Sequence, residues 1–250
     1  VYGEEGIGKS TFAAAAPKPV FIQTESGLGQ IDCAKFPVST TYQNVIECMK
    51  AIIKEDPDFD TVVIDSLDWL EKLVWEETRN HPENQKHHYY APDVAYGAGY
   101  SWAMKYWLEV SAHLQNIHAS GRNVILLAHS EGKNFKDPER ESYHIIGPAI
   151  HNLPMKLFNE WVDAILYAHT PISTKTETVG FDDEKKRHIP TAMRDVGGGL
   201  KRQLRCIRSA GARAKNRYNM PEILPLDWPT VAQYFGDSLI GKKVVENGTA

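Results

Sequence analysis

Apolar residues along this chain follow two patterns, short continuous runs and longer stretches with a helical spacing. The continuous runs are rich in valine and isoleucine, which is typical of strands buried on both faces of a parallel sheet. They predict strands over 19–24, 61–65, 123–129 and 161–168. The remaining stretches alternate with these strands and predict helices over 11–16, 42–54, 67–79, 101–120 and 153–159. This alternation predicts an α/β fold in which a mostly parallel sheet is flanked by helices.

The pattern changes in the last third of the chain, where β-rich segments are no longer separated by helices. Segments 173–179 and 203–209 predict antiparallel strands, so we expect C-terminal antiparallel strands to complete the sheet. Polar and charged residues over 130–141 predict a loop. We expect one domain over residues 1–236, followed by a polar tail over 237–250.

The composition of the 250 residues is that of a globular domain, with 42% hydrophobic and 24% charged residues. No apolar run approaches 18 residues, so we expect no membrane-spanning helix and no membrane partner. Cys33, Cys48 and Cys206 are widely spaced and odd in number, which argues against a disulfide framework or a zinc site. These features predict a protein of the reducing cytoplasm.

Charge is distributed unevenly along the chain, although the net charge is only −4. The segment 185–217 holds eleven lysine and arginine residues and one acid, Asp195, which gives +10, so the rest of the chain carries −14. A basic segment on an acidic body is typical of a protein that binds a polyanion such as nucleic acid. A solvated basic surface without a partner is an equally open interpretation.

Residues 3–10, GEEGIGKS, match the phosphate-binding pattern G-x-x-x-x-G-K-[ST]. In such a loop the backbone N–H groups surround phosphate oxygens, the lysine reaches the β- and γ-phosphates, and the serine hydroxyl binds Mg²⁺. Val1 and Tyr2 predict the end of a strand that is cut short, and we expect the natural chain to start upstream. The predicted nucleotide-binding residues are Gly3, Glu4, Glu5, Gly6, Ile7, Gly8, Lys9, Ser10 and Thr11.

Three polar residues end or follow predicted strands, at the edge of a parallel sheet where ligands bind. Asp65 could hold Mg²⁺ together with Ser10, or it could cap the helix that follows. Glu25 could orient and deprotonate the water that attacks a γ-phosphate, or be a solvated acid of a loop. His129 could sense the γ-phosphate, or lie at the surface without a role.

Lys215 and Arg217 lie on a predicted extended segment and are separated by one residue, so their side chains point to the same side. Such a pair of cations could contact a phosphate in the same subunit, in a neighbouring subunit or in DNA.

Together these motifs resemble the RecA-like ATPase core. The segment 62–67, VVIDSL, resembles the Walker B strand of that family, and 21–25, FIQTE, resembles the strand that ends in the catalytic glutamate. Ala128–His129 falls where the family has the polar residue that begins its first DNA-binding loop. Residues 215–217 resemble the Lys-x-Arg finger of DnaB-type ATPases, which reaches the γ-phosphate of a neighbouring subunit.

The resemblance implies a RecA-like P-loop NTPase core that binds ATP and Mg²⁺. Because the finger acts on a neighbouring subunit, it also implies a homo-oligomer, either a ring or a filament. The catalytic residues that it implies are Lys9, Glu25, His129, Lys215 and Arg217, and the implied metal ligands are Ser10 and Asp65.

More closely, the chain resembles phage-encoded, RecA-like or AAA-domain nucleotide-binding proteins, the group that contains single-strand annealing proteins. Residues 96–100, 123–129 and 212–217 carry this likeness. It implies an ATPase that acts on single-stranded DNA in phage recombination or replication, in the cytoplasm of a bacterial host. The alternative is a DNA-annealing or scaffolding module in which nucleotide sets the assembly state with negligible turnover. A helicase loader or packaging motor is disfavoured, because no partner-binding domain is visible.

The resemblance places DNA contacts in the predicted loop 130–141 and around 147–151. Three cations of the loop could meet phosphates, and one aromatic ring could stack on a base. These residues are Lys133, Lys136, Arg140 and Phe135. The loop also contains four acids, which argue against a surface that faces DNA. They are Glu131, Asp137, Glu139 and Glu141.

Overall fold

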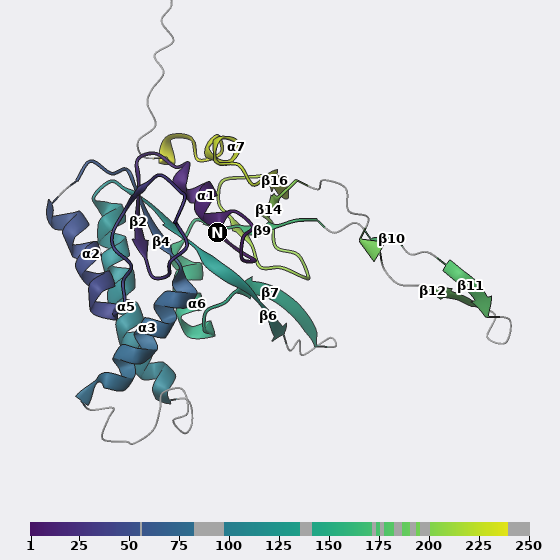
Figure 1. The fold of residues 1–250 in the computed structure, drawn as a ribbon, viewed down its shortest axis with the longest axis horizontal. Coiled ribbons are helices and arrows are strands. Elements are labelled where there is room, and N and C mark those ends of the chain that lie inside the picture. Colours follow the sequence, from purple (N-terminus) through teal and green to yellow (C-terminus); the bar gives the residue numbers. More distant parts are fainter. Residues whose placement is uncertain are drawn as a thin grey trace, which may run out of the picture.

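The computed structural model of the protein shows an α/β fold (Figure 1). It describes residues 1–55, 57–82, 98–135, 142–171, 174–175, 178–182, 187–190, 194–195 and 201–239. The helices are α1 (Lys9–Ala14), α2 (Tyr42–Glu55), α3 (Leu67–Asn80), α5 (Ala98–Ala119), α6 (Asn152–Trp161), α7 (Trp228–Ala232) and the 3-10 helix η2 (Gly236–Ser238). The strands are β1 (Tyr2–Gly3), β2 (Pro19–Gln23), β3 (Ala34–Lys35), β4 (Thr61–Asp65), β5 (Asn123–Leu126), β6 (Ala128–Phe135), β7 (Tyr143–Pro148), β8 (Ala164–Ile165), β9 (Tyr167–His169), β10 (Thr174–Lys175), β11 (Thr178–Asp182), β12 (Arg187–Pro190), β13 (Arg194–Asp195), β14 (Gln203–Arg205), β15 (Lys215–Asn216) and β16 (Ile223–Pro225).

Parallel strands form the centre of the molecule. One sheet has the order β3-β2-β4-β5 and another has the order β16-β14-β9-β1-β6-β7. They meet where β5 passes into β6. The Leu127 N–H donates to the Ile64 carbonyl of β4 at 3.0 Å, and the next N–H, of Ala128, donates to the Val1 carbonyl at 3.1 Å. Strands β1 to β6 and β9 pair in parallel, so their carboxyl ends lie along one edge.

Successive side chains of a strand point to opposite faces of the sheet. Alternate residues of the central strands therefore pack into two hydrophobic cores, one on each face. In β4, Val62 and Ile64 pack with α2, α3, α5 and α6, whereas Val63 packs with α1 and α7. Figure 1 shows α2, α3 and α5 together on one side of the sheet. All three side chains are fully buried, and each contributes about 1.5–3 kcal/mol to folding. A strand covered on both faces needs an apolar residue at every position, which explains the continuous run.

Most predicted elements are confirmed. The five predicted helices correspond to α1, α2, α3, α5 and α6, and the parallel sheet lies between helical layers as expected. The predicted C-terminal antiparallel strands are confirmed by β14, which pairs antiparallel with β9 and β16. Helix α7 was not predicted, although the sequence contains its cap. The Asp227 carboxylate accepts the Thr230 N–H at 3.1 Å.

The prediction of a loop over 130–141 was wrong for its first half. Ser130–Phe135 forms the outer part of β6, which pairs antiparallel with β7 from Ser130 opposite Pro148 to Phe135 opposite Tyr143. Glu131, Gly132 and Asn134 are exposed, so no alternation of apolar and polar residues marks this strand in the sequence. Residues 136–141 lie outside the described part of the chain.

The predicted strand over 161–168 also differs from the structure. Trp161 is the last residue of α6, and the strand that follows is divided into β8 and β9. The predicted strand over 173–179 corresponds to two short strands, β10 and β11. These pair antiparallel with β13 and β12, and the β11–β12 pair lies apart from the layered core (Figure 1). The domain boundary at residue 236 stays a prediction.

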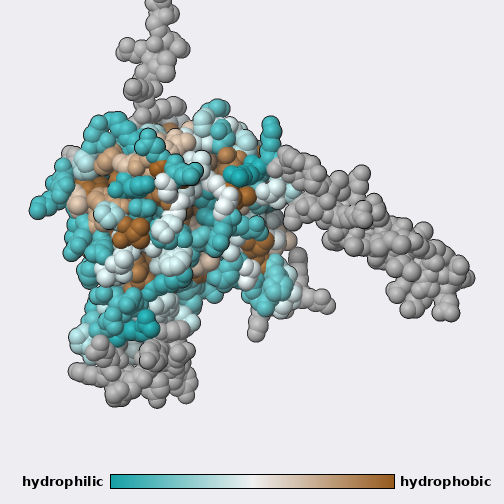
Figure 2. Space-filling model, in the orientation of Figure 1, coloured by the Kyte–Doolittle hydropathy of each residue, from teal (hydrophilic) through white to brown (hydrophobic). Residues whose placement is uncertain are grey.

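The surface is mixed in character. The face in Figure 2 is mostly hydrophilic, with small apolar areas scattered over it. Within the described residues, no helix has both the length and the apolar character needed to span a membrane.

Candidate functional site

The phosphate-loop sequence connects the end of β1 to the start of α1. Two of its glycines have positive φ angles, +70° at Gly6 and +105° at Gly8, which other residues adopt only with strain. Gly3 is needed for a different reason, because a Cβ at this position would overlap the Ala168 carbonyl oxygen of β9. The glycines of the motif therefore fit both the turn and its close packing against the sheet.

Lys9 is buried and turned back onto its own loop. Its ammonium donates to the Gly3 and Glu4 carbonyls, at 2.9 Å each. Burial lowers the pKa of Lys9, whereas the nearby carboxylates of Asp65, Asp68 and Glu25 raise it. The flexible stem of a lysine in this position lets the ammonium turn toward phosphate oxygens held by the loop.

Ser10 and Asp65 come together as their predicted roles require. The Ser10 hydroxyl donates to Asp65 Oδ2 at 2.7 Å, although 55 residues separate the two in the chain. Asp65 is 5% exposed, and burial raises its pKa while the bond from Ser10 lowers it. One hydroxyl and one carboxylate are hard oxygen ligands of the kind that Mg²⁺ takes beside nucleotide phosphates, so these residues fit the ion. No cluster of three or more potential metal-binding side chains occurs among the described residues.

Glu25 lies beside the Asp65–Ser66 segment. The Ser66 hydroxyl donates to Glu25 Oε1 at 2.8 Å. The Thr24 hydroxyl fixes the same segment by donating to the Ser66 carbonyl at 2.7 Å and accepting its N–H at 2.8 Å. Burial is the main cause that raises the pKa of Glu25, and the bond from Ser66 opposes it. A carboxylate with a raised pKa is a stronger base near neutral pH, so this environment suits proton abstraction.

His129 lies at the same edge, opposite Gly3 in the pairing of β6 with β1. Asp68, in the first turn of α3, holds it at two points. Its carboxylate accepts the His129 backbone N–H at 2.9 Å, and its other oxygen lies 2.8 Å from Nδ1 of the ring. Asp68 was missed by the sequence analysis. An acid three residues after Asp65, in the helix that starts at the sheet edge, was the available signal.

A second carboxylate of α3 lies one turn further along. Glu71 accepts the His151 backbone N–H at 2.9 Å, just before α6. Lys133 of β6 donates to the neighbouring Ile150 carbonyl, and its ammonium lies 3.9 Å from Glu131. Lys133, which was predicted to meet DNA phosphates, is thus engaged within the chain. The Phe135 side chain lies outside the described part of the chain, as do Lys136 and Arg140.

Glu71 gives a pH-dependent prediction, because burial raises its pKa to about 7. A carboxyl group with a higher pKa in the folded state than in the unfolded state lowers the free energy of unfolding when it is ionised. This loss is complete above the folded-state pKa and disappears below the unfolded-state pKa. We therefore expect Glu71→Gln to be more stable than the wild type at pH 8, by about 1–3 kcal/mol, with no difference near pH 4. Urea unfolding at both pH values measures this. The exposed Glu76 serves as control. If Glu76→Gln gave the same pH-dependent gain, the effect would not belong to Glu71.

Lys215 and Arg217 contact the end of α6. The Lys215 ammonium donates to the Asn159 and Val162 carbonyls, at 2.6 Å each, and so caps the carboxyl end of the helix. Arg217 forms an exposed ion pair with Asp163 at 2.8 Å and donates to the Glu160 carbonyl. None of these partners belongs to the phosphate loop, so within one subunit both cations have structural contacts elsewhere.

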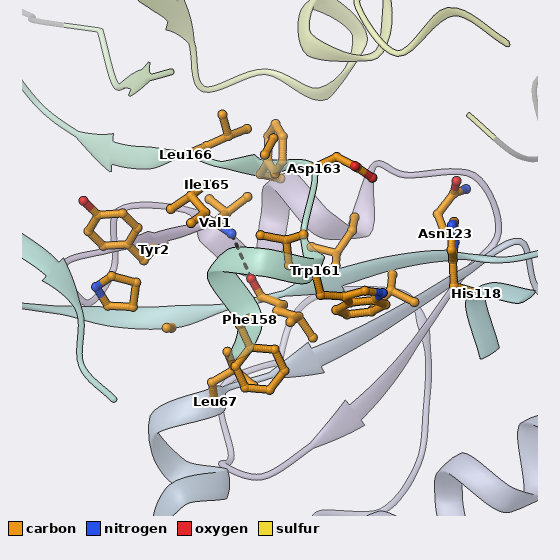
Figure 3. Close-up of a pocket in the computed structure, with 18 of the residues that line it drawn as sticks. Val1, Tyr2, Leu67, His118, Asn123, Phe158, Trp161, Asp163, Ile165 and Leu166 are labelled. Carbon is orange, nitrogen blue, oxygen red and sulfur yellow. Dashed lines mark hydrogen bonds between the residues drawn. The ribbon is translucent and has the colours of Figure 1, made fainter. Parts of the chain in front are cut away.

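A cavity of about 330 Å³ is lined by residues other than those of this edge. Figure 3 shows some of the side chains that line it. Phe158 and Trp161 of α6 and Ile165 of β8 line it, together with Val1, whose nitrogen donates to the Leu126 carbonyl at 2.8 Å. None of the residues predicted to bind nucleotide or metal lines it. The contacts of Ser10, Glu25 and His129 therefore make the sheet edge around the phosphate loop the candidate site.

Comparison with known proteins places the chain in a family. No curated protein sequence matches the chain. Among solved structures, the crystal structure of a KaiC-like protein from the hyperthermophilic archaeon Pyrococcus horikoshii is similar over 81% of this chain and 82% of that chain, at 13% identity and a TM-score of 0.32. A family model described as an AAA domain matches residues 1–218, which include the phosphate loop, Glu25 and Asp65. The chain therefore belongs to the AAA domain family of P-loop ATPases.

Proposed function

We propose that this protein hydrolyses ATP in the presence of Mg²⁺ and uses the reaction on single-stranded DNA, in phage recombination or replication inside a bacterial host. The observation that carries the ATPase part is the convergence of three pairs at one sheet edge. They are Ser10 with Asp65, Glu25 with Ser66, and His129 with Asp68.

Each residue has a role that its contacts allow. The loop N–H groups and Lys9 bind the phosphates, and Ser10 and Asp65 would hold Mg²⁺, which neutralises charge on the phosphates when bound. Glu25 orients the attacking water and takes its proton. His129, held by Asp68, reports whether a γ-phosphate is present. Phosphoryl transfer depends mainly on positioning and charge stabilisation, and these polar groups are of the types that supply both.

The DNA part of the proposal is supported by the basic segment 185–217, which carries +10 on a body of −14. Part of this segment forms β12, β13 and β14. A labelled single-stranded oligonucleotide should bind, and its affinity should fall steeply with salt because each neutralised phosphate releases counterions. Fluorescence anisotropy over a salt series measures this. An affinity that does not change with salt would rule out a phosphate-binding face.

The cations Lys215 and Arg217 give a prediction about assembly. If Arg217 completes the site of a neighbouring subunit, the ATPase rate per subunit should rise with protein concentration, and Arg217→Ala should abolish that rise without weakening ATP binding. Arg217 is the cleaner position to change, because its ion pair is exposed and worth about 0–1 kcal/mol. The exposed Arg79, in the last turn of α3, is the matched control. A constant rate per subunit across the assembly range would contradict the role in trans.

A second candidate function is favoured by the engagement of Lys215 with α6. If the finger stays in these contacts, turnover is negligible, and nucleotide binding only sets the assembly state of a DNA-annealing or scaffolding module. Measuring ATP hydrolysis with and without single-stranded DNA separates the two candidates. Hydrolysis that DNA stimulates supports the ATPase that acts on DNA, whereas nucleotide binding without turnover supports the annealing or scaffolding module.

A further inference from the structure

Arg202 lies against the phosphate loop, although the sequence suggested only that it belongs to a basic segment. A Cβ placed on Gly8 would lie 2.9 Å from Nη1 of Arg202 and 3.6 Å from Cδ2 of Leu226. The guanidinium thus covers the face of the loop where Gly8 carries no side chain. Lys9 and Ser10 follow directly in the chain, so Arg202 stands beside the residues that bind phosphate and metal.

Strand pairing fixes the backbone of Arg202 at this place. Arg202 directly precedes β14, and its carbonyl accepts the Leu226 N–H at 3.0 Å. Strand β14 pairs with β9, and β9 pairs with β1, which leads into the loop. The approach of Arg202 to Gly8 is therefore built into the sheet.

The Arg202 side chain is exposed, and no hydrogen bond or ion pair of its guanidinium is recorded with any described residue. Arg205, three residues further along and within β14, is paired with Glu222. A guanidinium presents five N–H donors in a planar fork and binds phosphate oxygens by two parallel hydrogen bonds. Arg202 is thus a cation at the phosphate loop whose hydrogen-bonding capacity is open to a ligand.

We propose that Arg202 binds the phosphate oxygens of the nucleotide in its own subunit. This inference rests on the proposed nucleotide-binding function and adds to it a phosphate contact that the loop motif does not contain. Because Arg202 belongs to the same chain as the loop, its contribution does not depend on assembly. That separates it from Arg217, whose proposed action is on a neighbouring subunit.

The test uses two ligands and dilute, unassembled protein. Dissociation constants for ATP and for inorganic tripolyphosphate, both with Mg²⁺, are measured for wild type, Arg202→Ala, Arg202→Lys and the control Arg79→Ala. We expect Arg202→Ala to weaken both ligands by about 10-fold to 100-fold, as for loss of charge-assisted hydrogen bonds. Arg202→Lys should recover part of the affinity, and Arg79→Ala should bind as the wild type does.

Three other outcomes would overturn the inference, and the affinities for the two ligands distinguish them. Unchanged affinity in both Arg202 variants would remove Arg202 from the site while leaving the proposed function intact. A loss for ATP alone, with tripolyphosphate unaffected, would assign the side chain to the base or ribose. Failure of the wild type to bind either ligand would overturn the proposed function and this inference together. Thermal unfolding of each variant shows whether it is folded, and Arg202→Lys supplies the comparison if Arg202→Ala is not.

Discussion

The Glu25→Gln variant is expected to bind ATP as the wild type does and to hydrolyse it about 100-fold to 10,000-fold more slowly. Glutamine keeps the size of the side chain, and its amide oxygen can still accept the hydrogen bond that Ser66 donates to Glu25. It cannot take a proton from water. The variant therefore removes the proposed base while it keeps the contacts that hold residue 25. Single-turnover hydrolysis and an ATP binding titration measure the two effects separately.

Glu76→Gln is the matched control, because Glu76 is an exposed acid of α3 away from the sheet edge. It should leave both measurements unchanged. Because the pKa of Glu25 is raised, the wild-type rate should fall on acidification at a higher pH than an unshifted carboxylate would give. Normal hydrolysis by Glu25→Gln would exclude Glu25 as the base, and another acid of the edge would then have to be tested.

The Lys9→Ala variant is expected to bind ATP about 100-fold more weakly than the wild type and to lose hydrolysis. Lys9 supplies a buried cation of the loop, and among the described residues its ammonium donates to carbonyl oxygens of the same loop. Without it, the loop loses the ammonium that is proposed to reach the β- and γ-phosphates. Calorimetric titration with ATP and Mg²⁺ measures the loss.

Lys18→Ala is the control for this prediction. Lys18 also carries a cation near α1, but it forms an exposed ion pair with Asp58 at 2.6 Å, away from the loop. Its removal should not change ATP affinity. Equal affinities of Lys9→Ala and wild type would mean that the loop does not bind phosphate through this lysine, and the motif would then have lost its usual function here.

The sequence predicted the positions of those site residues that directly follow a recognisable strand or lie in the phosphate-loop motif. The continuous run at 61–65 is typical of a buried strand, and a phosphate loop after another parallel strand places Asp65 and Ser10 at the same edge. Glu25 follows for the same reason, since β2 pairs in parallel with β4. Their placement at one edge is confirmed by the structure, whereas their roles stay predictions.

Residues whose positions depend on distant segments were not predictable in this way. The contacts of Lys215 join residues more than 50 positions apart, and no local pattern shows that α6 ends beside β15. Arg202 reaches Gly8 only because β14 pairs with β9 and β16. The outer part of β6 was missed because an exposed hairpin has no apolar alternation to reveal it.

Helix α3 has a mechanical consequence for the molecule. In its first turn, Asp68 accepts a hydrogen bond from the backbone N–H of His129. In its second turn, Glu71 accepts one from the backbone N–H of His151. These two anchor points lie at opposite ends of the β6–β7 hairpin segment of the chain, one before its outer part and one after it. A displacement of α3 along its axis would move both ends of the hairpin. The hairpin and the sheet edge that holds Asp65 therefore move together as long as both hydrogen bonds are intact.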